Sequence, residues 1–379
     1  MGFKKLVVNA LALGSVSRGF TGGEARRWVR EVFRYRTRNY GYSMHQTNWA
    51  IRHGFMPEQV ERLGINADNV DDYISAREYS FLRPLNGGYS KWITDKVTIH
   101  TIFKPFRGDM PKLYYQISKR YDETVVTNLE DGVYGGSFAE IFDLIKEKGE
   151  VSLMPANGVS ASTIEYKDGE FYFDEKKFSE EALEKHLSGF HSTLVIREKV
   201  RTSDIVDNGV LNLIVFNEFG DNPVIGDAYF VFDEYERKRV MTSEQRKEDS
   251  LEEEDVLDDK FREIRAEACD EIAGTWRGQK IPHWDEIKDT INRLCVFVPQ
   301  LEFFGCEIVI NEDGFKITRM MNMPDYPTCK PFSKQTSAYL TRKVAQKKEA
   351  YAKEGTRIAR GWKKIKLKEI GRASCRERV

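Results

Sequence analysis

The chain has 379 residues, of which 40% are hydrophobic, and this is enough apolar material for two or three packed units. Its 59 basic and 60 acidic side chains balance, which excludes the strong net positive charge typical of nucleic-acid-binding proteins. The five cysteines lie far apart without a CxxC pair, so no zinc site is expected, and no run of 18 apolar residues predicts a transmembrane segment.

Residues 1–75 are predicted to form a helical N-terminal region. The stretch "FLRPLNGGYSKW" (81–92) is rich in turn-forming residues and predicts a connector. Asp95 lies close to the start of the helix that follows, where an acidic side chain can cap the first turn. Helices are expected over 24–38, 57–63, 69–79 and 94–103.

The middle of the chain alternates between apolar runs of strand length and amphipathic helices. The Asp168-Gly169 pair favours a hairpin turn, and the apolar runs from 192 onward predict an antiparallel sheet. Helices are expected over 137–148 and 179–187. Strands are expected over 112–117, 151–155, 163–173, 192–200, 209–217 and 223–232.

The last third of the sequence contains segments that differ in charge and in hydrophobic pattern. Residues 243–273 are strongly charged and are expected to form a helical insertion exposed to solvent. An amphipathic helix over 284–298 and a hairpin over 306–320 follow. The basic segment over 333–368 is expected to be a surface helix.

The last eleven residues, "EIGRASCRERV" (369–379), have an unusual property. Their codons can be written so that the DNA resembles a common short-read sequencing adapter read in frame. We therefore expect this segment to be a sequencing artefact and the natural chain to continue beyond about Lys368. The alternative is a genuine basic tail.

Three stretches of the sequence resemble a known family. They are "FLRPLNGGYSKWITDKVT" (81–98), "KIPHWDEIKDTINRL" (280–294) and "PQLEFFGCEIVINEDGFKI" (299–317). In this order they resemble the sugar-transfer-associated ATP-grasp family, which includes TupA-like polysaccharide-modification proteins. The resemblance runs from about Tyr73 to Tyr326.

The resemblance implies an α+β chain with the ATP-grasp fold, in which two α+β subdomains with antiparallel sheets grip a nucleotide cleft. Residues 76–200 would form the N-terminal part with its phosphate flap, and residues 201–332 the C-terminal lobe. ATP and Mg²⁺ are the implied cofactors, because the family transfers phosphate from ATP to a carboxylate.

The resemblance also places site residues on this sequence. Lys96 corresponds to the family's first phosphate-binding lysine, and Glu198 to the acidic residue of the adenine hinge. The implied cofactor-binding residues are Lys96, Met154, Gly158, Ser160, Glu198, Lys199 and Val200. Glu307 and Asn322 are the implied metal ligands.

Two positions depart from the family pattern. Met154 stands where a second phosphate-binding lysine is expected, and Arg319 replaces a carboxylate that would bridge the metal ions. A guanidinium about 4 Å from Mg²⁺ would be repelled by several kcal/mol at an effective dielectric near 20. We therefore consider three roles for Arg319: a catalytic-site cation that contacts phosphate, an outward-facing residue displaced by a one-residue bulge that brings Asn322 to the metal, or an ordinary exposed arginine.

Two functions follow from this pattern. The first is a carboxylate–amine ligase with weakened catalysis, linked to bacterial surface or capsular polysaccharide biosynthesis. Its acceptor would be an unidentified carboxylate or glycan. The alternative is a degenerate nucleotide- or glycan-binding scaffold of a polysaccharide-synthesis complex. Either protein is expected in the cytoplasm, where its basic helix offers a means of peripheral association with the inner face of the membrane.

Overall fold

The computed structural model describes a large part of the chain, and contacts divide that part into two compact units. The first comprises described residues within 1–85 and 325–379, and the second those within 86–324. The described residues are 22–37, 41–80, 82, 83, 85–121, 123–130, 133, 135–158, 160–203, 209–218, 220, 223–232, 263–267, 271, 272, 281–324, 326 and 332–350.

The first unit is helical, as the sequence predicts. Its elements are α2 (Gly22–Thr37), α3 (Met44–His53), α4 (Pro57–Arg62), the 3-10 helix η1 (Val70–Asp72), α5 (Ala76–Ser80) and a helix over 334–350. The side chains of Ser43 and Gln46 form reciprocal bonds at the start of α3, which satisfy two amide groups that the helix leaves unpaired. Phe55, Leu63 and Ile65 form the buried centre of this unit.

The single helix predicted over 69–79 is wrong, because the structure has η1 and α5 there with an interruption between them. The hydroxyl of Ser75 accepts a hydrogen bond from the backbone amide of Glu78 at 3.1 Å. A serine that caps the start of a helix accepts this bond, so a new helix, α5, begins after Ser75.

The second unit begins with short helical elements: η2 (Gly87–Trp92), α6 (Lys96–Ile102) and η3 (Lys104–Asp109). A seven-stranded antiparallel sheet follows, in the order β2-β1-β7-β3-β4-β5-β6. Its strands are β1 (Leu113–Arg120), β2 (Glu123–Asn128), β3 (Glu150–Pro155), β4 (Ser162–Lys167), β5 (Glu170–Phe173), β6 (Lys176–Phe178) and β7 (Leu194–Arg197). Strand β2 lies where the sequence predicted a loop.

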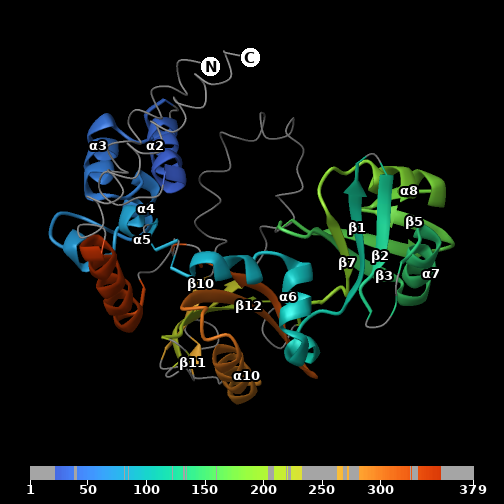
Figure 1. Ribbon diagram of the computed structural model, residues 1–379. Coiled ribbons are helices and arrows are strands. Elements are labelled where there is room, and N and C mark those ends of the chain that lie inside the picture. Colours follow the sequence, from blue (N-terminus) through green and yellow to red (C-terminus); the bar gives the residue numbers. More distant parts are fainter. Residues whose placement is uncertain are drawn as a thin grey trace, which may run out of the picture. The chain divides into compact units, whose positions relative to one another are not determined.

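Two helices cover one face of the seven-stranded sheet, α7 (Phe138–Lys148) and α8 (Glu180–Ser188) (Figure 1). Each begins at a serine whose hydroxyl accepts a backbone hydrogen bond, Ser137 for α7 and Ser179 for α8. Apolar side chains of both helices pack with the inward residues of the sheet to form one core.

The opposite face of this sheet carries a different set of side chains. Leu194 and Ile196 of β7 belong to the helix-covered core, so Val195 and Arg197 point to the other face, since strand side chains alternate. Met154 of β3 pairs with Val195 in the ladder and shares that face. The charged side chain of Arg197 therefore lies outside the apolar core that this sheet forms with α7 and α8.

A second, six-stranded antiparallel sheet has the order β11-β10-β9-β8-β12-β13. Its strands are β8 (Gly209–Phe216), β9 (Val224–Phe232), β10 (Glu263–Glu267), β11 (Glu271–Ile272), β12 (Phe303–Asn311) and β13 (Gly314–Met321). Helix α10 (Trp284–Phe297) packs on this sheet through Trp284, Ile287, Ile291 and Leu294, which follow helical spacing (Figure 1).

The helix predicted over 243–273 is wrong where the structure describes it, because β10 and β11 occupy 263–267 and 271–272. Their backbone groups pair with β9 and with each other at the edge of the six-stranded sheet. The charge of this segment predicted a helix, whereas backbone pairing along β9, which the charge pattern does not report, makes it a strand. Residues 243–262 lie outside the described part.

The predicted fold class is confirmed: an α+β chain in which a helical N-terminal region precedes two lobes with antiparallel sheets. The lobe boundary predicted at residue 200 falls between β7 and β8. Residues 334–350 of the predicted basic tail are helical, while 351–368 and the tail at 369–379 lie outside the described residues. Within the described residues, no helix is long and apolar enough to cross a membrane.

Candidate functional site

The start of α6 is fastened to the loop that follows β3. Asp95 accepts a hydrogen bond from the amide of Thr98 at 2.8 Å and so caps the helix. The ammonium of Lys96 donates to the carbonyl oxygens of Pro155 at 2.9 Å and Gly158 at 2.5 Å. The amide of Lys96 also donates to the carbonyl of Ala156 at 3.0 Å. Both the side chain and the backbone of Lys96 therefore contact the loop after β3.

Gly158 fits this loop because a side chain has no room there. A Cβ atom on Gly158 would lie 2.8 Å from the Cβ of Pro155, closer than such atoms approach in proteins. The amide of Gly158 donates to the carbonyl of Pro155 at 3.2 Å, which closes the turn. The carbonyl that Lys96 contacts is therefore held by a turn that requires glycine.

Gly158→Ala is expected to destabilise the protein by about 1–3 kcal/mol, because the turn must open to admit the methyl group. Gly108→Ala is the matched control, since a Cβ there meets nothing within 4 Å. Urea unfolding followed by tryptophan fluorescence measures both variants. Equal midpoints for the two would contradict the crowding at Gly158.

Arg197 connects the two sheets. Its Nη1 donates to the carbonyl of Thr318 in β13 at 2.9 Å. Thr318 is the extra residue of a bulge, because Glu307 pairs with Arg319 while the next residue, Ile308, pairs with Ile317. The bulge frees the Thr318 carbonyl from the ladder, and Arg197 uses it.

The bulge places Arg319 beside Glu307. Their side chains form an ion pair with Nη1 and Oε1 2.6 Å apart, and both are partly buried, with 31% and 27% exposed. Because Cys306 and Ile308 lie in the core on the α10 side, Glu307 points to the other face of the sheet. Arg319 therefore lies on the same face of the sheet as Glu307.

Three cations converge at this place, and we call Lys96, Arg197 and Arg319 the cation cluster. Burial, and then the charges of Arg197 and Arg319, lower the pKa of Lys96 to about 8, while Asp95 opposes the shift. Burial also lowers the pKa of Arg197 to about 10, against the opposing charges of Glu307 and Glu198. At neutral pH Lys96 and Arg197 therefore remain protonated.

One donor of the cation cluster has no partner. The Nε of Arg197 is buried, and its N–H donates to no acceptor among the described residues. A buried N–H left unpaired costs about 1–3 kcal/mol. An anion at this position would pair the donor and lower the repulsion among the three cations.

Arg197 was missed by the sequence-based reasoning. The signal that could have found it is the alternation within "LVIR" (194–197), where one arginine shares a strand face with Val195. Its partner in β13 lies 121 residues away, so the sequence gives no hint of the contact with Thr318.

The other implied cofactor-binding residues lie on the same lobe in varied settings. Met154 is buried with 5% exposed, so an apolar side chain fills the position of the expected lysine. Ser160 is exposed. Glu198 accepts a hydrogen bond from the amide of Lys112 at 3.0 Å and so closes the end of β7 against β1.

The segment after Glu198 offers backbone groups. The ammonium of Lys199 donates to the hydroxyl of Thr163 at 2.9 Å, which fixes its side chain. In the described structure no hydrogen bond engages the backbone amides of Lys199 and Val200. They remain candidates for the adenine contacts that the resemblance implies.

Each of the two implied metal ligands has another partner: Glu307 pairs with Arg319, and Asn322 binds Asn86. The Oδ1 of Asn322 accepts from the buried Asn86 amide at 2.9 Å, and Asn86 in turn binds both backbone groups of Phe303. Asn322 follows Arg319 by three residues, which is about 10 Å along a strand. The described residues contain no cluster of three or more His, Cys, Asp or Glu side chains that could hold a metal ion.

These residues do not fit Mg²⁺. The carboxylate of Glu307 already forms an ion pair with Arg319. Its charge also raises the pKa of the nearby Arg197. A divalent cation on Glu307 would therefore lie beside two guanidinium groups. The same residues suit an anion.

Comparisons with known proteins complete the description. No protein-family model matches the sequence, and no curated protein matches it. Among solved structures, the chain is similar to the ATP-grasp ligase PsnB complexed with minimal precursor, with 12% identity and a TM-score of 0.34 over 64% of this chain and 55% of PsnB. The chain thus spans about half the length of PsnB.

Two further structures are similar over a larger share. D-alanine--D-alanine ligase from Bacillus anthracis has 12% identity and a TM-score of 0.37, over 72% of this chain and 71% of that chain. D-alanyl-alanine synthetase A from Vibrio cholerae has 12% identity and a TM-score of 0.40, over 73% and 74%.

Proposed function

We propose that this chain is an ATP-grasp protein that binds the polyphosphate of ATP at the cation cluster. The observation that carries the proposal is the mutual proximity of Lys96, Arg197 and Arg319, whose charges lower the pKa of Lys96, together with the buried N–H of Arg197 that lacks an acceptor among the described residues. Asp95, Glu198 and Glu307 offset the charge of the three cations, and a phosphate oxygen would supply the acceptor that Arg197 lacks.

Each cation would contribute in its own way. Arg197 offers its unpaired Nε, a donor already fixed by the bond from Nη1 to Thr318. Arg319 offers a planar group that suits phosphate oxygens. Charge-assisted hydrogen bonds of this kind contribute roughly 1.5–3 kcal/mol each.

We further propose that carboxylate–amine ligation by this protein is weakened. Glu307 is committed to Arg319, and Met154 supplies no charge at its position in β3. Phosphoryl transfer depends on fixed cations that neutralise the developing charge. Guanidinium groups would supply part of that charge, but Glu307 is not free to hold a metal ion and Met154 adds no cation, so binding of the phosphates is favoured over their transfer.

The link to surface polysaccharide biosynthesis rests on the sequence resemblance over residues 81–98, 280–294 and 299–317. The acceptor, if ligation is retained, is proposed to be a carboxylate or a glycan. The alternative is a scaffold that binds nucleotide or glycan without turnover. Release of ADP in the presence of a glycan acceptor would distinguish the ligase from the scaffold.

ATP binding by Arg197→Gln tests the proposal. The amide keeps a donor for the Thr318 carbonyl but removes the charge, so affinity is expected to fall at least tenfold. Lys119→Ala removes one charge from an exposed position of β1 and should leave affinity unchanged. Isothermal titration calorimetry measures both, and an unchanged affinity for Arg197→Gln in a protein with a normal melting curve would overturn the proposal.

ATP binding is also expected to weaken as the pH rises through about 8. The free protein has a Lys96 pKa of about 8, so its ammonium loses its proton above that value, whereas the phosphates stay ionised. A bound anion favours the protonated ammonium of Lys96 and so raises its pKa. The protein with protonated Lys96 therefore binds ATP more tightly, and this extra affinity is lost as the pH rises. Titrations at about pH 7 and about pH 9.5 measure the effect, and Lys96→Met should remove the dependence.

A further inference from the structure

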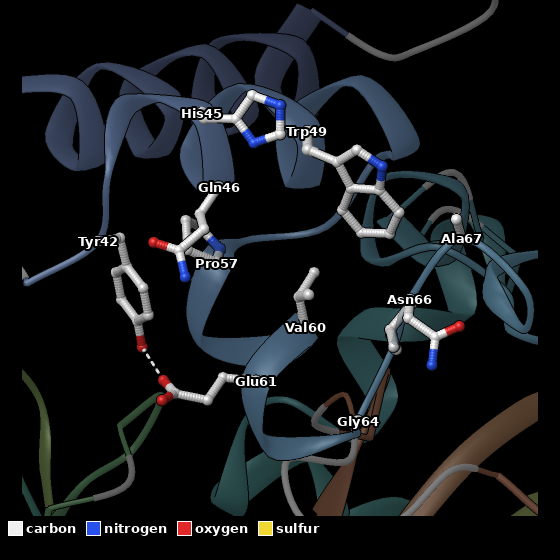
Figure 2. A pocket seen from close by; sticks show the side chains of 11 residues that line it. Tyr42, His45, Gln46, Trp49, Pro57, Val60, Glu61, Gly64, Asn66 and Ala67 are labelled. Atoms are coloured by element: carbon white, nitrogen blue, oxygen red, sulfur yellow. Dashed lines mark hydrogen bonds between the residues drawn. The ribbon is translucent and has the colours of Figure 1, made fainter.

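The first unit contains a pocket that is separate from the cation cluster. It lies between α3, α4 and the turn after α4, and its volume is about 530 Å³. Pockets of about 300–1,000 Å³ accommodate small-molecule ligands. Its lining residues are Tyr42, His45, Gln46, Trp49, Pro57, Val60, Glu61, Gly64, Ile65, Asn66 and Ala67 (Figure 2).

One side of the pocket is apolar and flat. Trp49 is half-buried, and its indole packs against the ring of His53 with centroids 4.3 Å apart, which fixes its orientation. Val60 and the methyl group of Ala67 lie close by in the same lining. An aromatic face of this kind suits aliphatic C–H groups, which carry slight positive charge towards the negative face of the ring.

The other side of the pocket carries oriented polar groups. The carboxylate of Glu61 accepts from the hydroxyl of Tyr42 at 2.8 Å through Oε2 (Figure 2). The side-chain oxygens of Gln46 and Asn66 accept from backbone amides, those of Ser43 at 2.9 Å and Asp68 at 2.8 Å.

These bonds fix the two amide groups. Since the oxygens of Gln46 and Asn66 are occupied, their NH₂ groups are the ends left to bind a ligand, and neither has a partner among the described residues. The pocket therefore offers NH₂ donors and a carboxylate acceptor beside an aromatic face.

The lining excludes two other ligand classes. No lysine or arginine is among the lining residues, and His45 is the one basic side chain in that list, so a phosphate or carboxylate meets no permanent counter-charge there. The rings of Trp49 and Tyr42 lie on opposite sides of the pocket and do not form a closed cage around one point (Figure 2). A quaternary ammonium would need such a cage.

We propose that this pocket binds a neutral, hydroxyl-rich ligand of the mono- or disaccharide class. The C–H face of a pyranose would lie on the indole of Trp49, while its hydroxyl groups would pair with Glu61 and the amides of Gln46 and Asn66. This site lies in the first unit and does not depend on ATP binding, so the two proposals fail separately.

Saturation-transfer NMR and calorimetry with the full chain test the site, using glucose, N-acetylglucosamine, cellobiose and chitobiose as probes. At least one probe is expected to bind in the millimolar range, with its ring protons nearest the protein. Trp49→Ala and the pocket-filling variant Ala67→Phe should each weaken binding about tenfold or more. Tyr121→Ala, at a fully exposed aromatic residue elsewhere, should have no effect.

Three results would overturn the proposal. The first is absence of binding by all four sugars. The second is equal affinity in wild type and Ala67→Phe, a variant whose exposed position leaves the core untouched. The third is displacement of a bound sugar by tetramethylammonium, which would identify the site as one for ammonium ligands.

Discussion

Arg319→Glu is expected to weaken metal-free ATP binding at least tenfold and to create a site for a divalent cation. The change reverses the charge beside Glu307, with which Arg319 now forms an ion pair at 2.6 Å. A unit charge pair at 4 Å contributes about 4 kcal/mol at an effective dielectric of 20, and partial exposure reduces this figure. After this reduction, the affinity for ATP measured in EDTA is still expected to fall at least tenfold.

The same variant would place two carboxylates directly opposite each other on β12 and β13. The Cβ atoms of such a pair are about 4.5–5.5 Å apart, which allows both to reach one cation. Without metal the two acids repel, so the melting temperature should rise when Mg²⁺ is added. Thermal melting with EDTA and with Mg²⁺ measures this gain.

Two matched variants isolate the effect of the charge at Arg319. Arg319→Gln removes the cation without adding an acid, so it should lose affinity for ATP but gain no response to Mg²⁺. Arg120→Glu makes the same reversal at an exposed end of β1 and should change neither property. If the melting temperature of Arg319→Glu does not depend on Mg²⁺, the side chain of Glu307 does not lie beside that of residue 319.

Phe304→Ala is expected to cost about 3–5 kcal/mol of unfolding free energy, the largest stability effect foreseen. Phe304 is fully buried in β12 and pairs with Val215, within the core between the six-stranded sheet and α10. Removing its ring leaves a cavity that rigid strands on both sides cannot close. Fluorescence of Trp284, in the same core, reports the urea transition.

Val296→Ala is the control for that measurement. Val296 lies in the last turn of α10 with 63% of its surface exposed, so its truncation should cost less than about 1 kcal/mol. A shift as large as that of Phe304→Ala would mean that the core of this lobe extends over Val296. Comparable stability of both variants and wild type would contradict the core described for this lobe.

Local features of the fold were predictable because they depend on neighbours in the sequence. Asp95, Ser137 and Ser179 each cap a helix within three residues, and the Asp168-Gly169 pair turns the hairpin of β4 and β5. Apolar runs of strand length marked most of the two sheets. Strands β10 and β11 were not foreseen, since their stability comes from pairing along β9.

The site was predictable only in part, for a physical reason. Lys96 and Glu307 stand in motif positions, so a resemblance could point to them. Arg197 depends on the bulge at Thr318, and the register of two strands determines that bulge. Which way Arg319 points could be settled only once that register was known.

The most direct test of the cation cluster is calorimetric titration of the wild-type protein with ATP, first in EDTA and then with excess Mg²⁺. Saturable binding in EDTA that does not strengthen with Mg²⁺ is predicted, because Lys96, Arg197 and Arg319 provide the charge and Glu307 is already paired. Binding that appears only when Mg²⁺ is present would contradict it.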